Sequence, residues 1–185
     1  MKAKWLLLPA LTLFLSACGY NSIQTMDETA AAAQQQIEVQ LQRRADLVPN
    51  LVETVKGYAA QEERIFTEVA QARSALLGAR SGGDMQAMAN ANQELTGSLG
   101  RLLAISENYP QLKSDQNFLR LQDELTGTEN RIAVSRTDYN NAVRDYNAYI
   151  RRFPAVLTAK VTGAKSREYF EVTNAANREA PKVGF

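Results

Sequence analysis

The chain has 185 residues, of which 45% are apolar, 22% charged and 8% aromatic, and its 21 Lys and Arg nearly balance its 20 Asp and Glu. This length fits one domain, the composition excludes a mostly disordered chain, and the balanced charge gives no support to nucleic-acid binding. The sequence contains no His and a single Cys; this excludes the usual zinc sites, His-based triads and disulfides within the chain, so we expect no metal and no cofactor.

The N-terminus has the pattern of an export signal. Lys2 and Lys4 begin the chain, an apolar run follows at 5–15, and the small residues 16–17 separate this run from Cys18. The run is shorter than the roughly 20 residues that a bilayer-spanning helix needs. We therefore predict a signal peptide rather than a transmembrane helix.

The residues that end this signal, Leu15-Ser16-Ala17-Cys18, resemble a bacterial lipobox. The resemblance implies a lipoprotein signal peptide at 1–17, cleavage before Cys18, and acylation of the Cys18 sulfur and of its new amino group with chains such as palmitate. The alternative is a buried Cys that follows an uncleaved signal. Several acyl chains would form a durable anchor, because each buried methylene contributes about 0.8 kcal/mol.

The residue after the predicted anchor indicates which membrane the protein reaches. Gly19 favours sorting to the outer membrane in a bacterium with two membranes, which places the protein in the periplasm or at the cell exterior. Removal of Lys2 and Lys4 with the signal peptide changes the formal net charge from +1 to −1. A basic patch is therefore not indicated, and we expect the lipid alone to hold the protein at the membrane.

The mature sequence predicts helices throughout. Residues 18–28 are expected to form the acylated N-terminus and a linker, and residues 29–160 a helical bundle. Between 24 and 80 the apolar residues recur every three or four positions, which is typical of one helix face. Pro49 interrupts this pattern. Either Asp46 caps a new helix there, or one long helix is kinked at the proline.

A second apolar seam is predicted to follow the proline. Its members are Leu51, Val55, Tyr58, Glu62, Ile65, Val69, Ala72 and Leu76. Gly78 is expected to end this helix, with Ser81 or Asp84 capping the next one. The third helix begins near Met85 and stops at Asn108-Tyr109-Pro110, because a residue before proline avoids the helical region.

The longest regular seam lies in the fourth segment. Apolar and aromatic residues recur at spacings of three and four from Phe118 to Phe153, and Pro154 ends the pattern. This spacing is typical of a helix packed as in a coiled coil. Short turns between the segments make neighbouring helices antiparallel. We predict an all-α fold, an elongated antiparallel bundle of three to four long helices, with residues 161–185 as a tail that packs on the bundle or frays.

Several ordered motifs resemble the LemA family. They are Tyr20-Asn21, the segment RADLVPNLV at 44–52, the segment ENYPQL at 107–112, the long stretch from Phe118 to Asn147, and the ending at 181–185. The resemblance implies an all-α, elongated helical bundle that is tethered to a bacterial membrane by its N-terminus, with no established catalytic activity. Many members carry an uncleaved transmembrane helix where this chain has a lipobox, which shifts the expected membrane from the inner toward the outer one.

The candidate site residues other than Cys18 are polar groups within these motifs. Arg44 and Asp46 lie at the Pro49 bend, where a capping Asp beside Arg is a sufficient structural explanation. Glu129, Asn130 and Arg136 lie near the long seam. Their structural role would be to fix helix register through buried hydrogen bonds, and the alternative is a polar groove for a peptide partner.

Three functions compete. The favoured one is a non-enzymatic scaffold or adaptor that binds other envelope proteins. The second is a self-assembling, membrane-associated structural protein, because heptad seams also serve between chains and would make a homo-oligomer. A hydrolase is the third; its candidate carboxylates are Glu62, Asp123, Glu124 and Glu129, but neighbouring residues such as Asp123 and Glu124 diverge by about 100° around a helix. We expect no enzyme and no catalytic residue.

Overall fold

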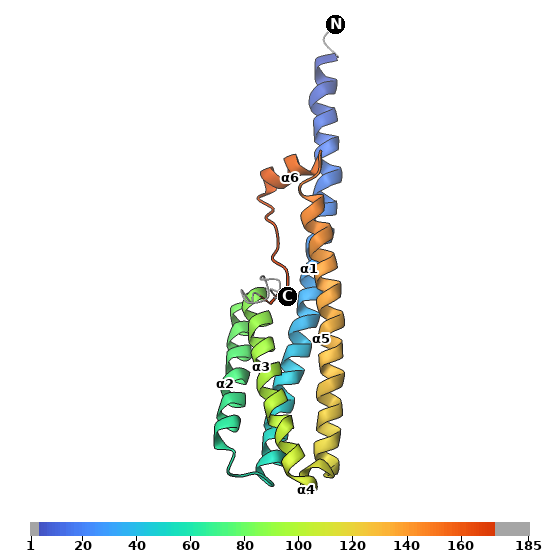
Figure 1. Ribbon diagram of the computed structural model, residues 1–185. Helices are drawn as coiled ribbons and strands as arrows, with labels where there is room; N and C mark the ends of the chain where they lie inside the picture. The colour runs from blue at the N-terminus through green and yellow to red at the C-terminus, as the bar shows by residue number, and fades with distance from the viewer. Residues whose placement is uncertain (1–3, 173–185) are drawn as a thin grey trace, which may run out of the picture. The chain divides into compact units, whose positions relative to one another are not determined.

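The described part of the chain is built from helices. The computed structural model describes the backbone of residues 4–172 and the side chains of residues 19–172. The elements are α1 (Lys4–Lys56), α2 (Glu63–Gly82), α3 (Met85–Ile105), the 3-10 turn η1 (Ser106–Asn108), α4 (Pro110–Lys113), α5 (Gln116–Tyr149) and α6 (Ala155–Thr162) (Figure 1). No strand occurs within 4–172. The predicted all-α bundle is confirmed.

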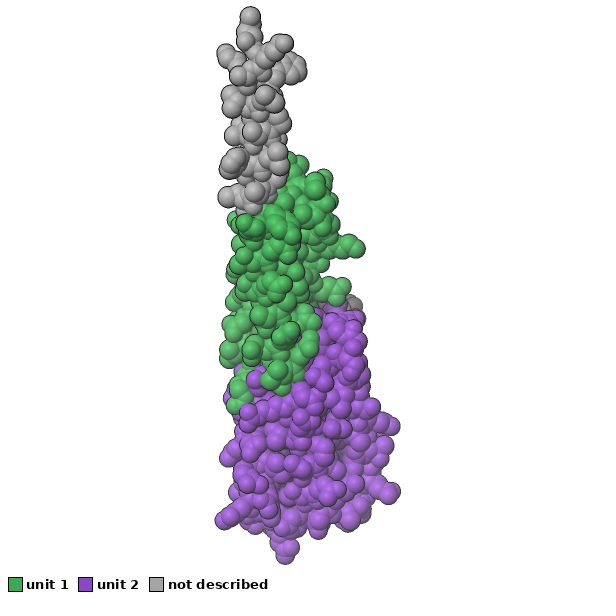
Figure 2. Space-filling model, turned by 180° about the vertical axis from the view of Figure 1, so that it is seen from behind, with its two compact units in different colours: residues 1–39, 131–169 green, residues 40–130, 170–185 purple. Residues whose placement is uncertain are grey.

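The chain divides into two compact units (Figure 2). Unit 1 contains residues 1–39 and 131–169, and unit 2 contains residues 40–130 and 170–185. The long helices α1 and α5 each contribute residues to both units. Each unit is described separately below.

Unit 2 is a helical bundle in which α2 and α3 form an antiparallel hairpin (Figure 1). Its core consists of aliphatic and aromatic side chains from every helix of the unit. The most fully buried are Leu41, Val48, Leu51, Val55, Val69, Leu76, Met88, Leu95, Leu102, Leu112 and Phe118. Their burial removes apolar surface from water, which is the main favourable term in folding.

The turn between α2 and α3 follows from its sequence. Gly83 adopts a left-handed conformation at φ 72° and its N–H donates to the Arg80 carbonyl, which closes α2. The Asp84 carboxylate then accepts from the N–H groups of Gln86 at 2.8 Å and Ala87 at 2.9 Å and caps α3. Asp84 is one of the two predicted caps. The expectation that Gly78 ends α2 was wrong, because the helix continues to Gly82.

Helix α1 runs through Pro49. A new helix capped by Asp46 is therefore excluded, and Asp46 instead accepts a hydrogen bond from Gln42 Nε2 at 2.7 Å within α1. Pro49 has no N–H, so the Ala45 carbonyl loses its donor one turn later in the helix. Arg73 Nε on α2 donates to this carbonyl at 2.7 Å. Packing of the surrounding core and this replacement donor keep the helix continuous.

The predicted seam from Leu51 to Leu76 is broken. Helix α1 ends at Lys56, and the chain reverses before α2 begins at Glu63. Ala59 is fully buried in the reversal, and Gln61 Nε2 donates to the Tyr109 hydroxyl at 2.6 Å. As a result Phe66, and not Ile65, faces the core. The apolar residues keep their spacing of three and four across this short reversal. Periodicity alone therefore did not reveal the break between the two helices.

Unit 1 combines parts of α1 and α5 with α6 and the segment after it. Ile23, Tyr146, Ile150 and Ala159 form its apolar cluster. Residues 18–28, for which a linker was expected, belong to α1. Helix α5 ends at Tyr149, before Pro154 as the sequence predicts. Phe153, the last residue of the predicted seam, is 81% exposed and does not join the core.

The segment after α6 is fixed to unit 1 by polar contacts. Asn147 makes two hydrogen bonds to the Arg167 backbone, donating to the carbonyl and accepting from the N–H, each at 2.9 Å. Arg167 Nε donates to Asp27 at 2.8 Å, and this hydrogen bond raises the pKa of Arg167. The described part of the predicted tail is therefore packed. Residues 173–185 lie outside the described residues.

Candidate functional site

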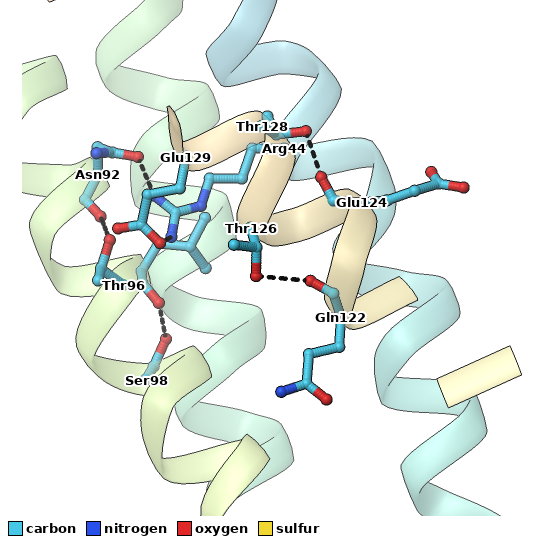
Figure 3. Close-up of polar contacts among 10 residues, drawn as sticks. Arg44, Asn92, Thr96, Ser98, Gln122, Glu124, Thr126, Thr128 and Glu129 are labelled. Carbon is cyan, nitrogen blue, oxygen red and sulfur yellow. Dashed lines mark hydrogen bonds and ion pairs between the residues drawn. The ribbon is translucent and has the colours of Figure 1, made fainter. Parts of the chain in front are cut away.

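Arg44 is a buried cation within unit 2 (Figure 3). Only 2% of the Arg44 surface is exposed to solvent. Nη1 donates to Asn92 Oδ1 on α3 at 2.7 Å, and Nη2 lies 3.6 Å from Glu129 Oε2 on α5. One guanidinium thus joins α1, α3 and α5. The fork of N–H donors suits Arg to such a three-helix junction.

Burial dominates the electrostatics of this junction. Desolvation lowers the pKa of Arg44, and the Glu129 carboxylate opposes this effect by raising it. The Arg44 Nε atom is buried without a hydrogen-bond partner, while the Glu129 side chain is 53% exposed. A buried cation with one strong and one weak partner is suited to positioning helices. It has no second titratable group at hydrogen-bonding distance for proton transfer.

The hydroxyl groups around Arg44 are also used within the helices. Thr96 donates to the Asn92 carbonyl at 3.0 Å, and Ser98 donates to the Leu95 carbonyl at 3.0 Å. On α5, fully buried Thr128 donates to the Glu124 carbonyl at 2.8 Å (Figure 3). These bonds occupy the hydroxyl protons and leave no nucleophile paired with a base.

The other predicted site residues are dispersed. Asp46 is exposed on α1, and Asn130 and Arg136 are exposed on α5. The structure therefore brings Arg44 and Glu129 together but leaves Asn130 and Arg136 outside a buried network. Cys18 lies outside the residues whose side chains are described.

The carboxylates considered for hydrolysis do not converge either. Glu62 lies at the start of α2, Asp123 and Glu129 are exposed on α5, and Glu124 is partly exposed. None of these four lines the groove between α2 and α3. Within the described residues, no group of three or more His, Cys, Asp or Glu is placed to hold a metal ion.

Unit 2 has an open groove between α2 and α3, which we call the α2–α3 groove. Its volume is about 490 Å³. It is lined by Glu68, Gln71, Ala72, Ala75, Glu94, Gly97, Ser98 and Arg101. Small side chains thus form part of its wall, and charged side chains stand beside them.

The charges in the groove are partly paired. Arg101 Nε lies 3.1 Å from Glu68, whose carboxylate is also 3.2 Å from Arg64 Nε. Glu94 is exposed on α3. Two carboxylates and one guanidinium therefore line the α2–α3 groove, and the nearby Arg64 guanidinium balances their charge. Gly97 is not among the site residues predicted from the sequence, because its place in a groove depends on which face of α3 is covered by α2.

The described part of the chain contains no helix that is both long enough and apolar enough to cross a membrane. The fold and these sites define an all-α helical protein whose polar groups mainly serve packing. The LemA family profile matches residues 33–185. The chain belongs to the LemA family.

Curated relatives share this sequence pattern. Two are Magnetosome protein MamQ 1 and Magnetosome protein MamQ 2 of Paramagnetospirillum magneticum, each 32% identical to this chain over 82% of its length. Magnetosome protein MamQ of Magnetospirillum gryphiswaldense is also 32% identical over 82% of the chain. The chain spans 64% of the length of each of these relatives.

Proposed function

We propose that this protein is a lipid-anchored, non-enzymatic adaptor of the bacterial envelope, which holds a segment of a partner protein in the α2–α3 groove. Membership of the LemA family and the name magnetosome protein carried by its relatives support a membrane-associated structural role. The pattern of Lys2, Lys4, an apolar run and Cys18 supports the lipid anchor. The anchored protein faces the periplasm or the cell exterior, at the outer membrane where the host has two.

The α2–α3 groove is the observation that carries the adaptor role. A volume of about 490 Å³ lies within the usual range for ligand sites. Its small wall residues Ala72, Ala75 and Gly97 leave room for an aliphatic side chain of the partner. Glu94 adds an exposed carboxylate beside this space. The fitting partner is a peptide segment or helix that carries an aliphatic residue next to Lys or Arg.

A single substitution tests the groove. Gly97→Leu fills it, because a Cβ at Gly97 would meet only Arg101 Nη1, at 3.8 Å, and the helix gains intrinsic propensity. Gly100→Leu is the matched control: it lies on the same helix, has open space around a Cβ, and is not part of the groove. A photo-crosslinking residue replaces Gln71 in all three chains, and crosslinks are captured in living cells.

The expected result is one recurrent partner that crosslinks to the parent chain and to Gly100→Leu, and is lost from Gly97→Leu. A partner that persists in Gly97→Leu, or no crosslink above background, would contradict the adaptor role of the groove. Mass spectrometry of the same samples tests the anchor separately. An unacylated Cys18, or an N-terminus that retains residues 1–17, would refute the lipoprotein assignment.

Self-assembly is the alternative, and its original motivation is weakened. This hypothesis rested on the possibility that the α5 seam serves between chains, but Tyr139 and Tyr146 are 1% and 3% exposed in the single chain. These side chains are already covered and are not available to a second copy without rearrangement. Crosslinks from residue 71 only to other copies of the chain would replace the adaptor hypothesis by self-assembly.

A further inference from the structure

Unit 1 carries an exposed apolar stripe outside the site described above. Phe153 is 81% exposed, Leu157 56% and Val161 88%. Leu157 and Val161 are four residues apart and lie on the same face of α6, and Phe153 lies in the turn just before this helix. Single exposed apolar residues are common on protein surfaces, but several large ones in one short segment favour an interaction surface.

The inner face of α6 is fixed to unit 1. Ala155 and Ala159 are 4% and 5% exposed, and Ala159 packs in the cluster that contains Ile23, Tyr146 and Ile150. Residues two positions apart point to nearly opposite sides of a helix. The burial of the alanines therefore directs Leu157 and Val161 away from unit 1.

Helix α6 also adjoins the start of the mature chain. A Cβ built on Gly19 would lie 3.2 Å from Thr158 Oγ1 and 3.9 Å from the Ala155 Cα. Gly19 directly follows Cys18, and consecutive Cα atoms are about 3.8 Å apart. A lipid on Cys18 would thus be attached one residue from the point where α6 packs on α1.

The charged residues of the chain segment that carries the stripe have one sign. Arg151, Arg152, Lys160 and Lys165 are exposed, and the sequence contains no Asp or Glu from 146 to 167. The net charge of the whole chain is near zero and therefore does not indicate this local basic cluster. Basic residues beside apolar ones are the composition that binds the headgroup region of anionic membranes.

We propose that α6 lies on the lipid surface beside the acylated Cys18, with Phe153, Leu157 and Val161 inserted among the headgroups and with the basic cluster on anionic phospholipid. The inference rests on the proposed lipid anchor. The anchor and α6 then hold unit 1 at two adjacent points, which restricts its orientation on the membrane. This proposal differs from the expectation that the lipid alone holds the protein at the membrane.

The test uses the full acylated chain in vesicles of phosphatidylethanolamine and phosphatidylglycerol. Val161→Cys supplies the free thiol, because the only native Cys is the acylated one, and it is labelled with an environment-sensitive fluorophore. Val134→Cys is the matched control: it is also an exposed valine of unit 1, at 62% exposure on α5. Vesicle flotation is measured first, and quenching by spin-labelled lipid second.

We expect both labelled proteins to float with the vesicles, and quenching at residue 161 to exceed that at residue 134 several-fold. Phe153→Ser combined with Leu157→Ser should abolish most of the difference without affecting the fold, since both side chains are exposed. Flotation with equal quenching at the two positions would overturn the α6 contact alone. Failure to float would overturn the anchor and the inference together. A label at 161 that is shielded in cells but not quenched in vesicles would identify a protein partner instead.

Discussion

The continuity of α1 at Pro49 depends on a contact from another helix, and this dependence can be measured. Proline removes the N–H that would bond the Ala45 carbonyl. Ala45 is 0% exposed, so water does not replace the missing donor. Arg73 Nε supplies it at 2.7 Å. Arg73→Met keeps most of the apolar side-chain length and removes this hydrogen bond.

The expected cost follows from the burial of the carbonyl. A hydrogen bond from a charged group contributes about 1.5–3 kcal/mol, and an unsatisfied buried acceptor costs a similar amount. We expect Arg73→Met to lower the free energy of unfolding by about 2 kcal/mol. Pro49→Ala restores an N–H that can bond Ala45 directly. In a chain that already carries Pro49→Ala, Arg73→Met should lower the free energy of unfolding by less than about 1 kcal/mol. The two substitutions are coupled in this way because Arg73 and the N–H at position 49 bond the same carbonyl.

The assay is urea unfolding of the four chains of this cycle, followed by far-ultraviolet circular dichroism, with hydrogen exchange of α1 amides to localise the effect. Arg64→Met is the matched control: the Arg64 side chain is 90% exposed, and its ion pair with Glu68 lies on the surface. It should cost below about 0.5 kcal/mol. The reasoning would be refuted if Arg73→Met lowered the free energy of unfolding equally in the parent chain and in the Pro49→Ala chain.

Three further predictions concern local geometry. Gly78→Ala in the interior of α2 should stabilise the protein by about 1 kcal/mol, whereas Gly83→Ala should destabilise it by about as much, because Gly83 is left-handed; thermal unfolding distinguishes the signs. The Phe118 N–H bond lowers the pKa of the Asp115 carboxyl, so its contribution is present above the ordinary Asp pKa of about 3.9 and is lost as pH falls through the lower folded value. The stability gap between the parent chain and Asp115→Asn should therefore close in acid, which a series of urea titrations checks. Tyr139→Phe removes the hydroxyl that donates to the Glu168 carbonyl at 2.8 Å; it should cost about 1 kcal/mol and speed proteolysis after Lys165.

Local signals predicted the parts of the fold that local chemistry determines. Asp84 caps α3 because a carboxylate just before a helix can reach its first free N–H groups. The α5 periodicity predicted Phe118 and Tyr139 in the core, where they are 2% and 1% exposed. Pro154 predicted that this helix does not run past it, and α5 ends at Tyr149, four residues before the predicted seam does.

Contacts between distant segments account for what the sequence did not reveal. Pro49 suggested a helix break, and the donor that allows continuity, Arg73, lies 28 residues away. The Arg44 motif was recognised, but its strongest partner, Asn92, lies 48 residues away. No local spacing relates such residues. Their pairing becomes visible only when the helices are packed.

The same distinction separates structure from function in this protein. Arg44 and its neighbours form the most distinctive polar cluster of unit 2, but their hydrogen bonds join helices of one chain and leave little for a ligand. The surfaces proposed to bind other molecules consist of small and apolar residues. They are a groove whose wall includes Gly97 and a stripe that includes the exposed Val161. The groove belongs to unit 2 and α6 belongs to unit 1, so each experiment changes residues of one unit. The two experiments can therefore fail independently, and partner binding can be assigned to one unit while membrane contact is assigned to the other.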